Sequence, residues 1–158
     1  MIPAWLTITL VTVLTAIALG SLVPQQGAGW FRRLRRPGWL TFEGLIPLIW
    51  TVTFIGGGWS AYIIWDYAPS NPTTWWMMGG YVLLELVTLT YTPVMLTLRR
   101  LRVGVAIGAT GLAIALALAI WIAPRSTPAV LLLLPYLLWS PVGTLVTWQM
   151  MQLNPADA

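Results

Sequence analysis

The residues of this chain that can do chemistry are aromatic rings and one carboxylate inside an apolar stretch. His and Cys are absent, and all eight basic side chains are Arg. The chain therefore has no imidazole base or imidazole metal ligand, no thiol nucleophile and no lysine for a Schiff base. Its eleven Trp instead offer flat apolar surfaces on which a planar molecule can stack. These residue types indicate binding rather than acid–base catalysis, and we assign no catalytic residue and no metal ligand.

Aromatic side chains recur every four residues in two apolar stretches, the spacing that places them on one face of a helix. The first such face consists of Trp50, Phe54, Gly58 and Tyr62. The second consists of Trp139, Gly143 and Thr147, with Tyr136 nearby. A glycine among rings leaves a gap that suits a flat, apolar ligand, which makes these eight residues candidate binding residues. Aromatic packing between helices explains the same pattern, and the sequence leaves both interpretations open.

Glu85 is the only carboxylate well inside an apolar stretch. Because burying an ionisable group in a membrane is costly, such a residue is a functional candidate. A neutral Glu85 can donate a hydrogen bond to a carbonyl or a ligand, whereas a charged one needs an Arg partner. The expected polar neighbours follow it in the same stretch: Thr88, Thr90, Tyr91 and Thr92. A structural hydrogen bond between helices is the alternative.

The elements that carry these residues are expected to be membrane spans. The chain is 58% apolar and 8% charged, whereas a soluble surface needs about a quarter or more of charged residues. A spanning helix needs about 20 mostly apolar residues. Five stretches qualify, at about 4–23, 45–65, 75–98, 103–123 and 129–152. We therefore predict one domain over residues 1–158, an all-α bundle of five transmembrane helices in a lipid bilayer.

The arginines predict the orientation of the bundle. Seven of them lie in the first and third connections, which fall on one side of a five-span chain: Arg32, Arg33, Arg35, Arg36, Arg99, Arg100 and Arg102. Only Arg125 lies on the other side. By the positive-inside rule the N-terminus is outside and the C-terminus cytoplasmic. A patch for anionic lipid or nucleic acid would also use arginines, but topology already explains each cluster, and we expect no nucleic-acid partner.

The ends and faces of the spans add three expectations. No basic residue precedes the first span, so we expect a retained helix rather than a cleaved signal. The triple glycine at 56–58 indicates a close approach by a neighbouring helix or a ligand, or a bend in the helix. Small residues also recur along the fourth span, on a face that looks exposed and suits helix packing: Gly104, Gly108, Gly111, Ala115 and Ala119.

Residues 30–65 resemble the TspO/MBR family, the tryptophan-rich sensory proteins and mitochondrial translocator proteins. The matching motif comprises Trp30, Arg36-Pro37-Gly38-Trp39, Trp50, Gly58 and Tyr62-Ile63-Ile64-Trp65. A second match is Leu134-Pro135-Tyr136-Leu137-Leu138-Trp139. The resemblance covers most of the chain, and its number of spans agrees with the five predicted above.

The resemblance implies a bundle of five helices, often dimeric, in the inner membrane of a bacterium. Family members bind tetrapyrroles such as protoporphyrin in a pocket under the first loop. By this resemblance, three residues match the family's pocket tryptophans: Trp39, Trp50 and Trp139. Arg35 and Arg36 would meet the ligand's carboxylates. The implied role is sensory or regulatory, without a covalently bound cofactor, and light-dependent porphyrin breakdown is a minor alternative.

The chain departs from the family pattern in the third and fifth spans. Glu85 stands at the family's Gln position, Leu89 and Thr92 stand where an Asn and a Trp are usual, and Thr147 replaces a late Asn. These changes support a second hypothesis, in which the chain is a structural or accessory subunit of a larger, pigment-bearing membrane complex. In that case the ligand pocket would be degenerate.

Overall fold

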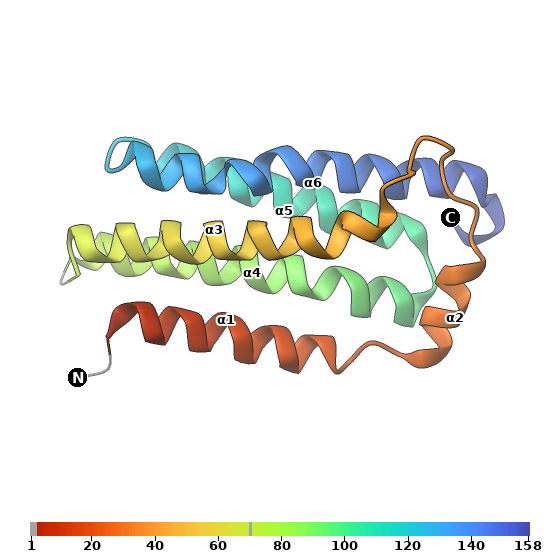
Figure 1. Ribbon diagram of the computed structural model, residues 1–158, viewed down its shortest axis with the longest axis horizontal. Helices are drawn as coiled ribbons and strands as arrows, with labels where there is room; N and C mark the ends of the chain where they lie inside the picture. The colour runs from red at the N-terminus through yellow and green to blue at the C-terminus, as the bar shows by residue number, and fades with distance from the viewer. Residues whose placement is uncertain (1–2, 70) are drawn as a thin grey trace.

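The computed structural model describes residues 3–69 and 71–158, and its long helices run side by side along one axis (Figure 1). The helices are α1 (Ala4–Gly20), α2 (Gln25–Arg33), α3 (Ile46–Tyr67), α4 (Pro72–Leu98), α5 (Leu101–Ile122) and α6 (Thr127–Leu153), with short 3-10 helices at Glu43–Leu45 and Pro155–Asp157. Four of them, α3 to α6, are long and apolar enough to cross a membrane. Together α1 and α2 also meet this criterion, but they are bent by 79° at their junction. The predicted all-helical class with apolar span helices is confirmed.

The helix ends differ slightly from the expected spans, for local reasons. α1 ends at Gly20 rather than near residue 23. α4 and α6 begin earlier than expected because Asn71 and Ser126 cap them, accepting hydrogen bonds from the backbone N–H of Thr73 (2.9 Å) and Ala129 (3.2 Å). Both helices also carry a proline in the first turn, where an N–H has no partner within the helix and proline therefore removes no hydrogen bond.

The short helix α2 was not expected, since the sequence indicated only a polar connection there. It turns across the end of the bundle and packs against α4 (Figure 1). Gly27 lies directly against the backbone of Leu96, so no side chain fits at this position. The buried ring of Trp30 donates a hydrogen bond from Nε1 to Oδ1 of Asp157, at 2.7 Å. α2 therefore ties the first connection to α4 and to the C-terminal segment.

The packing order places α5 between α4 and α6, α3 against α6, and α1 against α3 and α4 (Figure 1). The first connection, the α4–α5 connection and the C-terminus meet at one end, here called the loop end. The N-terminus, the α3–α4 connection and the α5–α6 connection lie at the other end, here called the turn end. The seven arginines of the first and third connections are thus grouped at the loop end, with Arg125 at the turn end. Which end faces the cytoplasm remains a prediction.

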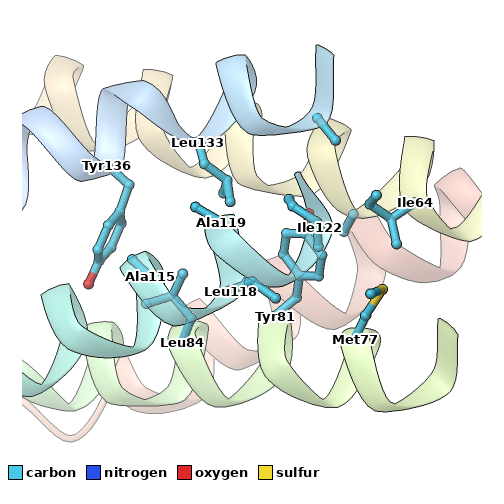
Figure 2. Close-up of a cluster of buried hydrophobic side chains, with 12 residues drawn as sticks. Ile64, Met77, Tyr81, Leu84, Ala115, Leu118, Ala119, Ile122, Leu133 and Tyr136 are labelled. Carbon is cyan, nitrogen blue, oxygen red and sulfur yellow. The ribbon is translucent and has the colours of Figure 1, made fainter. Parts of the chain in front are cut away.

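Two buried clusters hold the helices together. The larger one joins α3, α4, α5 and α6, and ten of its residues are labelled in Figure 2. Within it, the buried hydroxyl of Ser60 bonds to the Tyr81 hydroxyl (2.5 Å) and to the Ala129 carbonyl (2.7 Å), which links three helices. The smaller cluster lies at the loop end, where Trp30, Leu34 and Leu40 from the first connection pack on α4, α5 and α6.

The small-residue face of α5 lies inside the bundle, whereas the sequence suggested that it would be exposed. Ala115 is fully buried. Gly111 faces the Tyr136 hydroxyl, and Gly108 faces Thr144 so closely that a methyl group at either position would collide with the α6 side chain. The face therefore serves contact between α5 and α6 within one chain.

The triple glycine of α3 makes one close helix contact and leaves space beside the other two glycines. A Cβ at Gly56 would lie 2.5 Å from the carbonyl oxygen of Leu132, so this glycine allows close contact between α3 and α6. A Cβ at Gly57 would meet nothing within 4 Å, and one at Gly58 would lie 3.9 Å from Ile8. Gly57 and Gly58 face a cavity instead.

Candidate ligand-binding site

Two cavities lie inside the bundle, one after the other along its long axis. The loop-end cavity, of about 580 Å³, is enclosed by all five long helices and by the first connection. The distal cavity, of about 620 Å³, lies toward the turn end among α1, α3, α4 and α6. Phe54, Thr88 and Tyr136 line both cavities and form the wall between them. Each volume falls in the range of about 300–1,000 Å³ that is usual for small-molecule sites.

Helix α1 forms the outer wall of both cavities. Its residues at four-residue spacing face inward: Ala4, Ile8 and Thr12 line the distal cavity, and Ala16 and Gly20 line the loop-end cavity. No described residue of α1 is fully buried. Its inner face therefore contacts α3 and α4 less closely than α5 contacts α4 and α6, and it borders both cavities.

Aromatic rings from α3 and α6 line the loop-end cavity. Trp50 lies edge-on to Tyr136, with ring centroids 6.2 Å apart, and is tilted against Phe54 at 6.0 Å. On the other helix, Trp139 lies edge-on to Phe42 at 6.4 Å. The aromatic side chains thus also pack on one another, as the alternative interpretation required, yet they leave a cavity between the helices.

The indole Nε1 of Trp139 is a buried donor without a partner among the described residues. Only 9% of this side chain is exposed. A Cβ at Gly143, one turn further along α6, would lie 3.9 Å from this Nε1, and both residues line the loop-end cavity. Because a buried N–H normally has an acceptor, this atom marks a place where a ligand acceptor fits.

Other polar groups of the loop-end cavity are paired across helices. The hydroxyls of Tyr91 on α4 and Thr147 on α6 share a hydrogen bond. Likewise, the hydroxyls of Thr88 and Tyr136 are 2.9 Å apart. These bonds fix the lining residues of α4 and α6 relative to each other, and leave a largely apolar surface between them.

The distal cavity contains Glu85. Its Oε2 accepts a hydrogen bond from the Thr12 hydroxyl of α1 at 3.2 Å, while its Oε1 is buried without a partner among the described residues. The threonines that follow Glu85 in the sequence do not provide this bond. Their hydroxyls point elsewhere, since Thr88 bonds to the Leu84 carbonyl (2.7 Å) and Thr90 to the Val87 carbonyl (2.9 Å).

The TspO/MBR family model matches residues 7–153, almost the whole chain. The chain belongs to the TspO/MBR family. A search of curated proteins finds no match. Membership of the TspO/MBR family, together with the apolar helices, makes this a multi-pass membrane protein of a generally ligand-binding or regulatory kind.

In this TspO/MBR protein the predicted site residues are divided between the two cavities. The loop-end cavity brings together Trp50, Phe54, Tyr136, Trp139, Gly143 and Thr147. The distal cavity contains Gly58 and Glu85 and shares Phe54 and Tyr136. Four candidates, Trp39, Tyr62, Arg35 and Arg36, are not among the residues that line either cavity.

The first connection positions Trp39 and Arg36 at the loop end. Trp39 donates a hydrogen bond from Nε1 to Oε1 of Gln149 at 2.6 Å and contacts the cavity indirectly, since its neighbour Phe42 reaches Trp139. Arg36 donates to the carbonyls of Phe31 (2.8 Å) and Leu34 (2.6 Å) and forms an ion pair with Glu43 at 3.4 Å. Arg36 therefore holds the first connection in its observed conformation. Its ion-pair partner Glu43 lines the loop-end cavity and places a carboxylate there.

Two contributors were missed as site residues. Phe42 lies between Trp39 and Trp139 and contacts both rings. Tyr91 lines the loop-end cavity and bonds to Thr147. Because Tyr91 comes six residues after Glu85, helical spacing places the two side chains on different sides of α4.

Proposed function

We propose that the loop-end cavity binds a flat, apolar tetrapyrrole of the porphyrin type, and that the protein acts as a sensor or regulator in a bacterial inner membrane. The observation that carries this proposal is the unpartnered indole N–H of Trp139, buried in a cavity of about 580 Å³. Aromatic walls supply stacking and apolar contact, and the N–H supplies one oriented polar contact. Since the chain has no His, a metal in such a ligand would have no imidazole ligand.

The carboxylates of a porphyrin fit the charge at the loop end. Arg36 is already close to the cavity through its ion pair with Glu43. Arg35 is exposed in the same connection, where its backbone N–H donates to Asn154 and leaves the guanidinium available. Arginine pairs with carboxylates through two parallel hydrogen bonds. Arg35 can therefore hold the polar edge of a ligand whose ring lies between α3 and α6, while Arg36, held by Phe31, Leu34 and Glu43, adds positive charge beside it.

The proposal is tested by titrating purified protein with protoporphyrin and following the absorbance of the porphyrin. Replacing Trp139 by Phe removes the N–H and keeps a ring, so affinity should fall about tenfold, the effect of losing about 1.4 kcal/mol. Gly143→Leu should fill the cavity and abolish binding, because a Cβ there meets only Trp139 within 4 Å.

Two control variants make the same kinds of substitution at positions outside the loop-end cavity. Trp59→Phe alters a ring on α3 that is 60% exposed. Gly79→Leu places the same new side chain on α4 at an exposed glycine with no neighbour within 4 Å. Both should bind porphyrin as the parent does. Saturable binding that survives Gly143→Leu unchanged would contradict the proposal.

The accessory-subunit hypothesis loses one of its reasons. It relied partly on an exposed small-residue face along α5, and that face is buried within the chain. Migration on a native gel after mild extraction distinguishes the hypotheses, because a subunit would co-migrate with a larger complex, whereas a sensor would run as a monomer or homodimer.

A further inference from the structure

The distal cavity presents a carboxyl group that no cation of the chain accompanies. Glu85 is the only Asp, Glu or Arg among the residues that line it. All eight arginines lie at the two ends of the bundle, Arg102 in the first turn of α5 and the others in the connections between the long helices. The one ion pair among the described residues joins Arg36 to Glu43 at the loop end. Glu85 thus lies in mid-bundle with a single hydroxyl bond and one buried oxygen unpaired.

The arrangement around Glu85 suits a ligand cation. A buried carboxylate is stabilised by a positive charge and by hydrogen bonds to both oxygens. Thr12 satisfies Oε2, so the remaining place for a donor is beside Oε1. The faces of aromatic rings attract ammonium groups, and Phe54 and Tyr81 line the same cavity.

Toward the turn end the distal cavity becomes apolar and aromatic. Trp65 and Trp75 lie there edge-on to each other, with ring centroids 4.7 Å apart. Ten residues of α4 separate Trp75 from Glu85, which corresponds to about 15 Å along the helix. Between these ends the α3 wall carries only small residues, Gly57, Gly58 and Ala61. The cavity therefore has room for an elongated molecule with one polar end.

We propose that the distal cavity is a second binding site, independent of the loop-end cavity, for a lipophilic amine. Its ammonium group donates to Oε1 of Glu85, and its aromatic or alkyl body extends along Gly57 and Gly58 toward Trp65 and Trp75. The proposal does not depend on porphyrin binding, because the residues that would hold the two ends of the amine line only the distal cavity: Glu85, Gly57, Gly58, Trp65 and Trp75.

The probe for this site is 4-phenylbutylamine, with 4-phenylbutanol as a neutral molecule of nearly the same shape. Isothermal titration calorimetry of the full chain in detergent micelles should show saturable binding of the amine, at least tenfold tighter than the alcohol. Glu85→Gln keeps the size and the Thr12 bond but removes the charge. In this variant the amine should lose at least tenfold in affinity, and the difference between the two probes should disappear.

Gly57→Leu provides an independent test, since a side chain at this position enters the cavity without meeting another atom within 4 Å. It should abolish binding of the amine and leave porphyrin binding unchanged. Conversely, Gly143→Leu should leave amine binding unchanged. Gly79→Leu is the matched control, and thermal melting shows whether each variant is folded. Equal amine affinity in the parent and Glu85→Gln, or amine binding unaffected by Gly57→Leu in a folded protein, would overturn the proposal.

Discussion

At the residue scale, the unpaired polar atoms distinguish the cavities from the packed interior. Buried polar groups of folded proteins nearly always have a partner. Ser60, deep between three helices, follows this rule with two hydrogen bonds. Trp139 Nε1 and Glu85 Oε1 break it, and each belongs to a residue that lines a cavity. The two exceptions therefore mark places where a ligand atom completes the hydrogen bonding.

The ion pair between Arg36 and Glu43 leads to a prediction about ligand charge. Glu43 is half exposed and lines the loop-end cavity, so its negative charge opposes a carboxylate entering near Arg36. We expect Glu43→Gln to tighten binding of protoporphyrin by about threefold, and to cost little stability because exposed ion pairs contribute under about 1 kcal/mol. Absorbance titration measures the affinity. The dimethyl ester of protoporphyrin is the control, and an equal gain for this uncharged ligand would contradict the charge argument.

At the element scale, the apolar spans followed directly from composition, but α2 did not. Nine residues with two glycines and two arginines have no intrinsic reason to form a stable helix. α2 forms where Gly27 allows contact with α4 and where Trp30 finds a partner in the C-terminal segment. Such contacts join residues far apart in the chain, so no local pattern could reveal them.

The contact between α3 and α6 predicts opposite effects for two adjacent glycines. Gly56→Ala places a methyl group 2.5 Å from the Leu132 carbonyl oxygen, so the helices must separate. We expect a loss of about 2 kcal/mol in the free energy of unfolding, within the usual cost of overpacking. Gly57→Ala meets no atom within 4 Å and should gain up to about 1 kcal/mol from helix propensity. Thermal unfolding in detergent measures both, and equal effects would disprove the close contact.

At the scale of the whole molecule, the sequence identified aromatic faces but not the division into two cavities. Trp50 and Tyr62 share one face of α3, yet twelve residues of helix separate them, which is about 18 Å along the axis. One ligand cannot contact both ends of such a face. Periodicity therefore predicts which side of a helix faces inward, whereas the depth of each cavity depends on how α1 and the first connection close the bundle.

The grouping of arginines predicts how the whole bundle lies in the membrane. Seven arginines at the loop end should place it in the cytoplasm, with the turn end outside. Because the chain has no Cys, single substitutions can be labelled without background. Gly38→Cys reports the loop end and Ala123→Cys the turn end, and both positions are exposed. A membrane-impermeant maleimide should label Ala123→Cys on intact right-side-out vesicles and label Gly38→Cys only in inverted vesicles. The reverse pattern would show that the arginine-rich loop end faces outward, against the positive-inside rule.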